Sequence, residues 1–239
     1  MSKKKILLLS DDLRMSSGVG TMSREFVLGT LHHYDWVQVG GAIKHPDEGK
    51  IIDMNDNVRK QTGVDDAYLK IYPVSGYGSE LLIRQISDME GGFDAILHYT
   101  DPRFWGWLYQ MEHELRRTTP IFYYNIWDDL PYPRWNEPFY ESCDLIMNIS
   151  KQTVNIVDNV CQIKPRTDWD NTYIPHGINE NNFYPIDSSH KEWGDLLQFK
   201  RTVTRNKNYD FIVFWNNRNI RRKLPGDVIM AYKHFCDML

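Results

Sequence analysis

The sequence predicts an α/β protein built on a doubly wound, mostly parallel β-sheet. Short apolar runs, such as residues 6–9, stand between charged residues, which is typical of strands that a parallel sheet buries on both faces. These runs alternate with segments whose apolar residues follow the helical period. Such short alternating units indicate βαβ crossovers, so we expect a Rossmann-like domain.

The expected elements follow one another up to residue 174, apart from one excursion. The predicted strands cover residues 6–9, 36–39, 69–74, 94–98, 120–125, 144–149 and 172–174. The predicted helices cover residues 22–31, 79–89, 104–117 and 151–161. In the second helix we expect Leu82, Ile86 and Met89 to face the sheet. The polar stretch 44–66 has little periodicity and is expected to leave the sheet.

The chain is predicted to have three parts. Residues 1–185 form the Rossmann-like domain, and residues 186–210 form a polar connector with a helix at about 190–201. A strand at residues 211–215 and a helix at 227–239 then begin a second alternation. One strand and one helix cannot bury their own faces, so we interpret residues 211–239 as the start of an incomplete second domain.

Composition limits the classes of function. The formal net charge of −4 over 239 residues argues against a general nucleic-acid binder, which needs clustered Lys and Arg. The three cysteines lie far apart, with no pair at zinc-ligand spacing. The apolar run at residues 6–9 is too short for a signal peptide or a membrane span. We expect a cytoplasmic protein without a transmembrane segment or a nucleic-acid partner.

Aromatic residues are abundant, and many stand among polar residues, as in residues 99–105 and 127–135. Aromatic faces stack on sugars and bases, while the polar edges of Tyr and Trp form hydrogen bonds. This placement suits a carbohydrate or nucleotide cleft. Ordinary surface packing is the alternative.

Two nucleotide-binding patterns are missing. A dinucleotide site needs G-x-G-x-x-G directly after the first strand, whereas Gly18 and Gly20 come late and Ser23 stands in place of the third glycine. The predicted second strand runs into residues 39–42 without the acid that binds a ribose. NAD is therefore disfavoured, and no P-loop supports ATP hydrolysis.

Four segments carry a family resemblance. They are residues 17–21 (SGVGT), 144–150 (DLIMNIS), 174–185 (beginning IPHGI and ending FYP) and 211–223 (beginning FIVFWNNR and ending RRK). In this order and spacing, the chain resembles the family-4-like glycosyltransferases of the GT-B fold. The resemblance covers nearly the whole chain, from the acceptor-side domain into the beginning of the donor-binding domain.

The resemblance implies that the diphosphate of a sugar donor is bound without a metal. The implied donor-phosphate contacts come from Gly18, Val19, Gly20, Arg218 and Lys223. Glycines at a helix entrance let backbone N–H groups approach a phosphate, and cations neutralise a leaving diphosphate. The alternatives are a helix entrance that needs small residues and a solvated basic turn.

Polar residues at the expected strand ends are the candidates for the acceptor site, because clefts of open α/β sheets lie there. The sugar-binding candidates are Asp11, Tyr99, Asp101, Trp127 and His176, and the catalytic candidates are Asp128 and His98. For both histidines, simple packing is the alternative.

The chain departs from the family pattern at two points. Trp127 stands where many relatives have a histidine, so Asp128 or Asp129 would replace part of that role. No pair of glutamates with the family's later E-x7-E spacing follows Lys223. We therefore expect weak or no transferase activity from these residues alone.

The sequence thus predicts a glycosyltransferase that moves a sugar from a nucleotide diphosphate sugar to a glycan or another glycosyl acceptor, with retention if the resemblance holds. The nucleotide sugar would be a substrate, with no cofactor and no metal, since no Asp-x-Asp motif ends a predicted strand. Two alternatives stay open. One is a degenerate domain that binds a glycan or forms a homodimer through an exposed C-terminal segment, and the other is a sugar-nucleotide epimerase.

Overall fold

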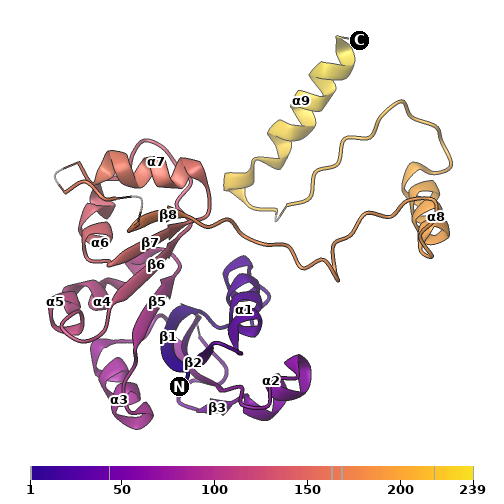
Figure 1. Cartoon of the computed structure of the whole chain (residues 1–239). Coiled ribbons are helices and arrows are strands. Elements are labelled where there is room, and N and C mark those ends of the chain that lie inside the picture. The colour runs from indigo at the N-terminus through magenta and orange to yellow at the C-terminus, as the bar shows by residue number, and fades with distance from the viewer. Residues whose placement is uncertain (1, 43, 163, 168, 218, 239) are drawn as a thin grey trace. The chain divides into compact units, whose positions relative to one another are not determined.

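The structure is a computed structural model of the chain, and it describes residues 2–42, 44–162, 164–167, 169–217 and 219–238. Its internal contacts divide the chain into two compact units, Met1–Asn179 and Glu180–Leu239 (Figure 1). The division into domains at residues 185 and 210 stays a prediction.

An eight-stranded sheet organises the first unit (Figure 1). Its strands are β1 (Lys4–Asp11), β2 (Tyr34–Ala42), β3 (Ile52–Asp53), β4 (Leu69–Ser75), β5 (Ala95–Tyr99), β6 (Ile121–Asn125), β7 (Leu145–Asn148) and β8 (Asn171–Tyr173). The order across the sheet is β3-β4-β2-β1-β5-β6-β7-β8, and within the described residues only β3 pairs antiparallel. The protein is therefore α/β with a doubly wound, Rossmann-like sheet, as predicted.

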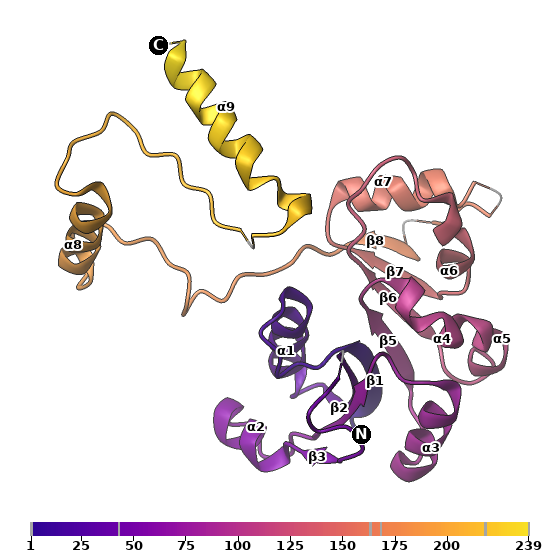
Figure 2. The ribbon, with the colours of Figure 1, turned by 180° about the vertical axis from the view of Figure 1, so that it is seen from behind.

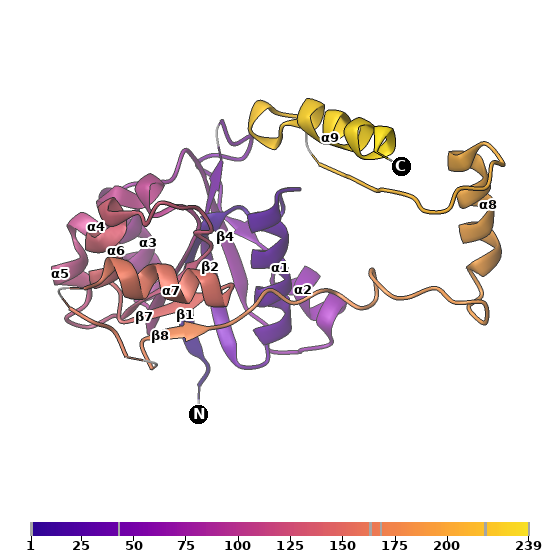
Figure 3. The ribbon, with the colours of Figure 1, turned by 90° about the horizontal axis from the view of Figure 1, so that it is seen from above.

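Helices cover both faces of this sheet. They are α1 (Gly18–Thr30), α2 (Asn55–Thr62), α3 (Glu80–Glu90), η1 (Pro102–Trp105), α4 (Gly106–Gln110), α5 (Glu112–Leu115), η2 (Arg134–Asn136), α6 (Glu137–Glu141) and α7 (Lys151–Val160). The helices α1 and α2 lie on one face, and α3 to α7 lie on the other (Figure 2 and Figure 3).

The central strand β1 contributes to the core on both faces. Leu7 and Leu9 pack into the cluster that α3, α4, α6 and α7 close, whereas Ile6 and Leu8 pack into the cluster beneath α1 and α2. Successive side chains of a strand point to opposite faces. Burial on both sides therefore explains why this strand is continuously apolar rather than alternating.

Serine caps set the start of three helices that follow strands. The side chains of Ser17, Ser79 and Ser150 each accept a hydrogen bond from the backbone N–H three residues later, at the starts of α1, α3 and α7. A cap of this kind contributes about 1 kcal/mol. The helix starts therefore lie near the carboxyl ends of the strands, where a site in this fold is expected.

Three sequence expectations need correction in this unit. The stretch 44–66 contains the short strand β3 and the helix α2, and the predicted helix at 104–117 is divided into η1, α4 and α5. In α3, Ile83 and Ile86 are buried, whereas Met89 is 58% exposed. The buried face of α3 therefore includes Ile83 and Ile86 and is rotated away from Met89, relative to the face predicted from the sequence.

The second unit has α8 (Trp193–Thr204), η3 (Arg221–Lys223) and α9 (Pro225–Asp237). The two helices expected near residues 190–201 and 227–239 are confirmed, with shifted ends. The strand predicted at residues 211–215 is wrong, because the segment is not assigned as a strand and joins no sheet within the described residues. An apolar run becomes a strand only where a neighbouring strand accepts its hydrogen bonds. None of the described helices is long and apolar enough to cross a membrane.

Candidate functional site

The candidate site lies where the strand order reverses, between β1 and β5. From β1 the chain adds β2 and β4 on one side and then β5 to β8 on the other. Ligands of open α/β sheets bind in the crevice outside the carboxyl ends at this switch point. Ser10 pairs with Tyr99 across the two central strands, so Asp11 comes one residue after this pair and Asp101 two residues after it.

Asp11 places a half-buried carboxylate in this crevice. Its Oδ2 accepts a hydrogen bond of 2.9 Å from the hydroxyl of Ser17, and that same hydroxyl oxygen accepts the N–H of Gly20 at 2.9 Å. Burial raises the pKa of Asp11, and the bond from Ser17 offsets part of this rise. Asp11 is thus a partly desolvated acceptor beside the entrance of α1.

Tyr77 lies near the acids on both sides of the crevice and was missed by sequence reasoning. The pKa of Tyr77 is raised by burial and then by the charges of Asp11 and Asp101, so both carboxylates act on its hydroxyl group. A side chain at Gly41 would come within 2.7 Å of the Tyr77 ring, so Gly41 leaves it room. Phe104 stacks on Tyr77 at 4.8 Å between centroids. The usable signal was an aromatic residue between two glycines just after a predicted strand.

Asp101 is held by an arginine that in turn covers a tryptophan. The guanidinium of Arg103 donates to Asp101, with Nε 2.9 Å from Oδ1. Burial would raise the pKa of Asp101, but the bonds from Arg103 outweigh it and the pKa is lowered. The Arg103 guanidinium lies 5.3 Å from the ring centre of Trp127, a cation–π arrangement. Asp128 follows Trp127 and is exposed.

A row of buried amides fixes the backbone of Trp127. The Trp127 N–H donates to Asn125 at 3.1 Å, Asn125 donates to Asn148 at 3.1 Å, and Asn148 donates to Asn171 at 2.7 Å. Asn171 donates to the Asp158 carboxylate at 2.7 Å. All four bonds run in one direction across β6, β7 and β8, so they polarise one another. The loop after β6 is therefore firmly positioned.

His98, a catalytic candidate in the sequence, belongs to the core. It is 0% exposed, stacks on Tyr123 at 4.9 Å, and its Nδ1 lies 2.7 Å from the Tyr109 hydroxyl. Burial lowers its pKa to about 3, so the imidazole stays neutral. A group without exposed surface cannot meet a ligand at the crevice, so His98 is better explained by packing.

His176 does reach the end of the sheet. Its Nε2 lies 3.3 Å from the Tyr99 hydroxyl, and its ring lies 5.4 Å from that of Tyr124. Loss of water around the imidazole lowers the pKa of His176. Tyr99 is 3% exposed, and burial is the main reason that its pKa is raised.

The two glycines of the loop have different surroundings. A Cβ on Gly20 would lie 2.7 Å from the Met15 carbonyl and 2.8 Å from that of Asp12, whereas a Cβ on Gly18 meets nothing within 4 Å. Gly20 is therefore required for packing at the helix entrance. Gly18 and Val19 are the first residues of α1, whose N–H groups have no acceptor within the helix.

The predicted basic pair lies in the second unit. Arg218 lies outside the described residues, and Lys223 is half-exposed at the end of η3. The donor-phosphate role of both residues stays a prediction.

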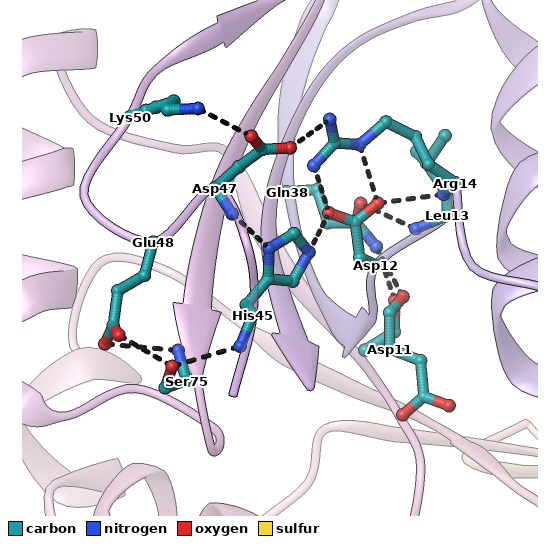
Figure 4. A network of polar contacts seen from close by, with 11 residues as sticks. Asp11, Asp12, Leu13, Arg14, Gln38, His45, Asp47, Glu48, Lys50 and Ser75 are labelled. Carbon is teal, nitrogen blue, oxygen red and sulfur yellow. Dashed lines mark hydrogen bonds and ion pairs between the residues drawn. The ribbon is translucent and has the colours of Figure 1, made fainter. Parts of the chain in front are cut away.

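A separate polar network lies at the carboxyl ends of β1 and β2, and Figure 4 shows it with Asp12 between Arg14 and His45. Asp12 is 0% exposed and accepts from Arg14 at 2.8 Å and from His45 Nε2 at 2.9 Å. The Asp47 N–H donates to His45 Nδ1, so Nε2 carries the proton that Asp12 accepts. Burial opposes ionisation of Asp12, but the bonds from Arg14 lower its pKa overall. A Cβ on Gly40 would lie 2.9 Å from Asp12, so this glycine makes space for the network.

Comparisons with known proteins add no assignment. The sequence matches no protein-family model and has no significant match among curated proteins. Among the described residues, no group of three or more His, Cys, Asp or Glu side chains is arranged to hold a metal ion.

Proposed function

We propose that the first unit is the acceptor-side domain of a GT-B-type, family-4-like glycosyltransferase, which transfers a sugar from a nucleotide diphosphate sugar to a glycosyl acceptor. The observation that carries the proposal is the crevice at the switch point, where Asp11 follows β1 and Asp101 follows β5, the two paired central strands. Carboxylates accept hydrogen bonds from sugar hydroxyls, and aromatic rings offer faces for the apolar side of a sugar.

The roles differ between the acids. The carboxylate of Asp11 accepts a hydrogen bond from Ser17 and has a raised pKa, so we assign it to a sugar hydroxyl. Asp101 is neutralised by Arg103 and positions that guanidinium over Trp127. Asp128, exposed in the loop after β6, is the proposed group for proton transfer.

The glycine loop is a less favourable phosphate site than its sequence suggested. The N-terminus of a helix attracts anions, but the Asp11 carboxylate already lies against the cap of α1 through Ser17. A second anion would meet that charge. Contacts of Gly18 and Val19 with a donor phosphate are therefore favoured only when Asp11 is protonated.

Calorimetric titration of the 239-residue chain with UDP-glucose, GDP-mannose and small oligosaccharides tests the proposal. We expect weak nucleotide-sugar binding and oligosaccharide binding that Asp11→Asn lowers about tenfold, since a hydrogen bond to a charged group contributes about 1.5 kcal/mol. Asp88→Asn, at an exposed position of α3, is the matched control. Absence of binding for every nucleotide sugar and oligosaccharide would overturn the proposal, and epimerised donor formed without an acceptor would favour the epimerase.

A second candidate function is assembly without catalysis. In the second unit, the segment 211–215 is 39–83% exposed and α9 has no buried residue. Exposed apolar surface of this extent is typical of protein contacts. A stable dimer in light scattering, together with no nucleotide-sugar binding, would favour this candidate.

A further inference from the structure

An apolar pocket of about 280 Å³ lies beside the crevice, in the first unit. The helix α1 contributes Met22 and Phe26, the sheet contributes Tyr124 and Met147, and the segment after β8 contributes Ile174 and Ile178. The pocket lies on the sheet face that carries α1, whereas the helices after β5 cover the other face (Figure 3).

The size and lining of the pocket suit a hydrocarbon group. An apolar cavity of about 150 Å³ is enough to bind benzene, so this one admits a longer chain. The two methionines, Met22 and Met147, come from opposite walls and have flexible, polarisable side chains that adapt to an irregular ligand. A ligand in a pocket with this lining gains binding free energy from the apolar area that it buries.

Tyr124 connects the pocket to polar groups at the end of the sheet. This residue lines the pocket, and its ring lies 5.0 Å from the ring of Tyr99 and 5.4 Å from that of His176. The Tyr99 hydroxyl and His176 Nε2 are 3.3 Å apart. A ligand with its chain in the pocket therefore has hydrogen-bonding groups within reach of its polar head.

Charge selects the kind of head group. Glu25 of α1 lines the pocket and accepts a hydrogen bond of 3.1 Å from Asn179, so a carboxylate stands in the wall. Asp11 adds a second acid on the crevice side. An anionic ligand would therefore meet a carboxylate in the pocket wall, and the charge of Asp11 acts on the Tyr99 hydroxyl that its head would approach, so binding of an anion is unfavourable.

We propose that this pocket binds the alkyl chain of an uncharged, amphipathic glycosyl acceptor, whose polar head lies against Tyr99 and His176. That the ligand is a glycosyl acceptor rests on the proposed function, whereas binding of its alkyl chain does not. The ligand class is thus a glycoside or alcohol that carries a hydrocarbon tail.

Calorimetric titration of the full chain with methyl, butyl and octyl β-glucoside, each below its critical micelle concentration, tests the proposal. We expect a stoichiometry of one and an affinity that rises about threefold to fourfold for each added methylene. Octanoate, which has a similar tail and an anionic head, should bind about tenfold more weakly than octyl glucoside. Equal affinity for the three glucosides would overturn the proposal.

Paired variants locate the binding. Met22→Glu places a charge in the pocket and should lower octyl glucoside affinity at least about tenfold. Met89→Glu, the same change on exposed α3, should leave it unchanged. Ile178→Ser, at a residue that is 76% exposed, removes one wall without disturbing the core and keeps the test valid if Met22→Glu does not fold. If neither pocket variant weakens binding, the pocket assignment is wrong.

The outcomes separate this inference from the proposed function. Chain-length-dependent binding of the glucosides that Met22→Glu removes, without any binding of nucleotide sugars or of oligosaccharides that lack a tail, would support the pocket and overturn the transferase. Nucleotide-sugar binding with no dependence on chain length would overturn the pocket and support the transferase.

Discussion

Two neighbouring aspartates at the end of β1 belong to regions that use charge in opposite ways. In the polar network at the carboxyl ends of β1 and β2, Asp12 is fully buried and its two oxygens are bonded to Arg14 and His45. In the crevice beside β5, Asp11 is half-buried, accepts from Ser17, and its side chain points away from that network (Figure 4). An acid has a structural role when protein donors occupy both of its carboxylate oxygens, and it is available to a ligand when they do not. Its position in the sequence does not decide between the two.

The largest expected effect comes from removing each acid in turn. Asp12→Ala leaves Arg14 and His45 without their shared carboxylate and should lower the free energy of unfolding by about 3 kcal/mol. Asp11→Ala removes the bond from Ser17 and should cost less than about 1 kcal/mol. Urea unfolding followed by circular dichroism measures both. Similar losses for the two variants would break the comparison.

The glycines of the α1 entrance sharpen the same contrast. Gly20→Ala forces a methyl group against the Met15 and Asp12 carbonyls and should destabilise by about 2 kcal/mol. Gly18→Ala meets open space and should change stability by no more than about 0.5 kcal/mol. Thermal unfolding of the two variants at one pH checks the difference. A larger loss for Gly18→Ala would contradict the packing role assigned to Gly20.

The smallest expected effect is a difference in pH dependence. The pKa of Asp12 is lowered on folding, so its ionised form stabilises the folded protein. This contribution to the free energy of unfolding is present above the unfolded-state pKa of about 4 and is lost as the pH falls through the folded-state pKa. Asp11 has a raised pKa, so its ionisation lowers stability as the pH rises past the unfolded value. The free energy of unfolding is measured from about pH 3 to pH 6. As the pH falls, it should decrease less steeply in Asp12→Asn than in wild type and more steeply in Asp11→Asn.

His98 provides a background common to these proteins. Its pKa of about 3 means that the unfolded chain takes up a proton below about pH 6.5 that the folded chain does not, so stability falls in acid in all of them. Only the differences between variants therefore report on the aspartates. Identical pH profiles for wild type and both variants would remove the distinction between the two acids.

The sheet was predictable because apolar runs, such as residues 6–9, alternate in the sequence with segments of helical period. The helix α2 was not, since its residues are mostly polar and only Val58 is buried. The run at 211–215 has the composition of a strand, but its conformation depends on a partner that sequence cannot supply.

Part of the candidate site followed from strand ends alone, since Asp11 and Asp101 do lie at the switch point. The partners that give each acid its character could not be predicted. His45 is 33 residues from Asp12, and Tyr77 reaches the crevice from the loop after β4. The burial of His98 depends on Tyr109 and Tyr123, which come from other elements.

The contact between Arg103 and Trp127 gives the crevice an optical reporter of its own. Indole emission responds to a nearby charge, and the guanidinium lies 5.3 Å from this ring, while Nε1 of Trp127 is held by the Asp129 carbonyl at 3.1 Å. A ligand that draws Arg103 away from the ring would shift the fluorescence of this one tryptophan without altering the fold. Occupancy of the crevice can thus be followed in the unlabelled protein, with Trp127→Phe identifying the source of the signal.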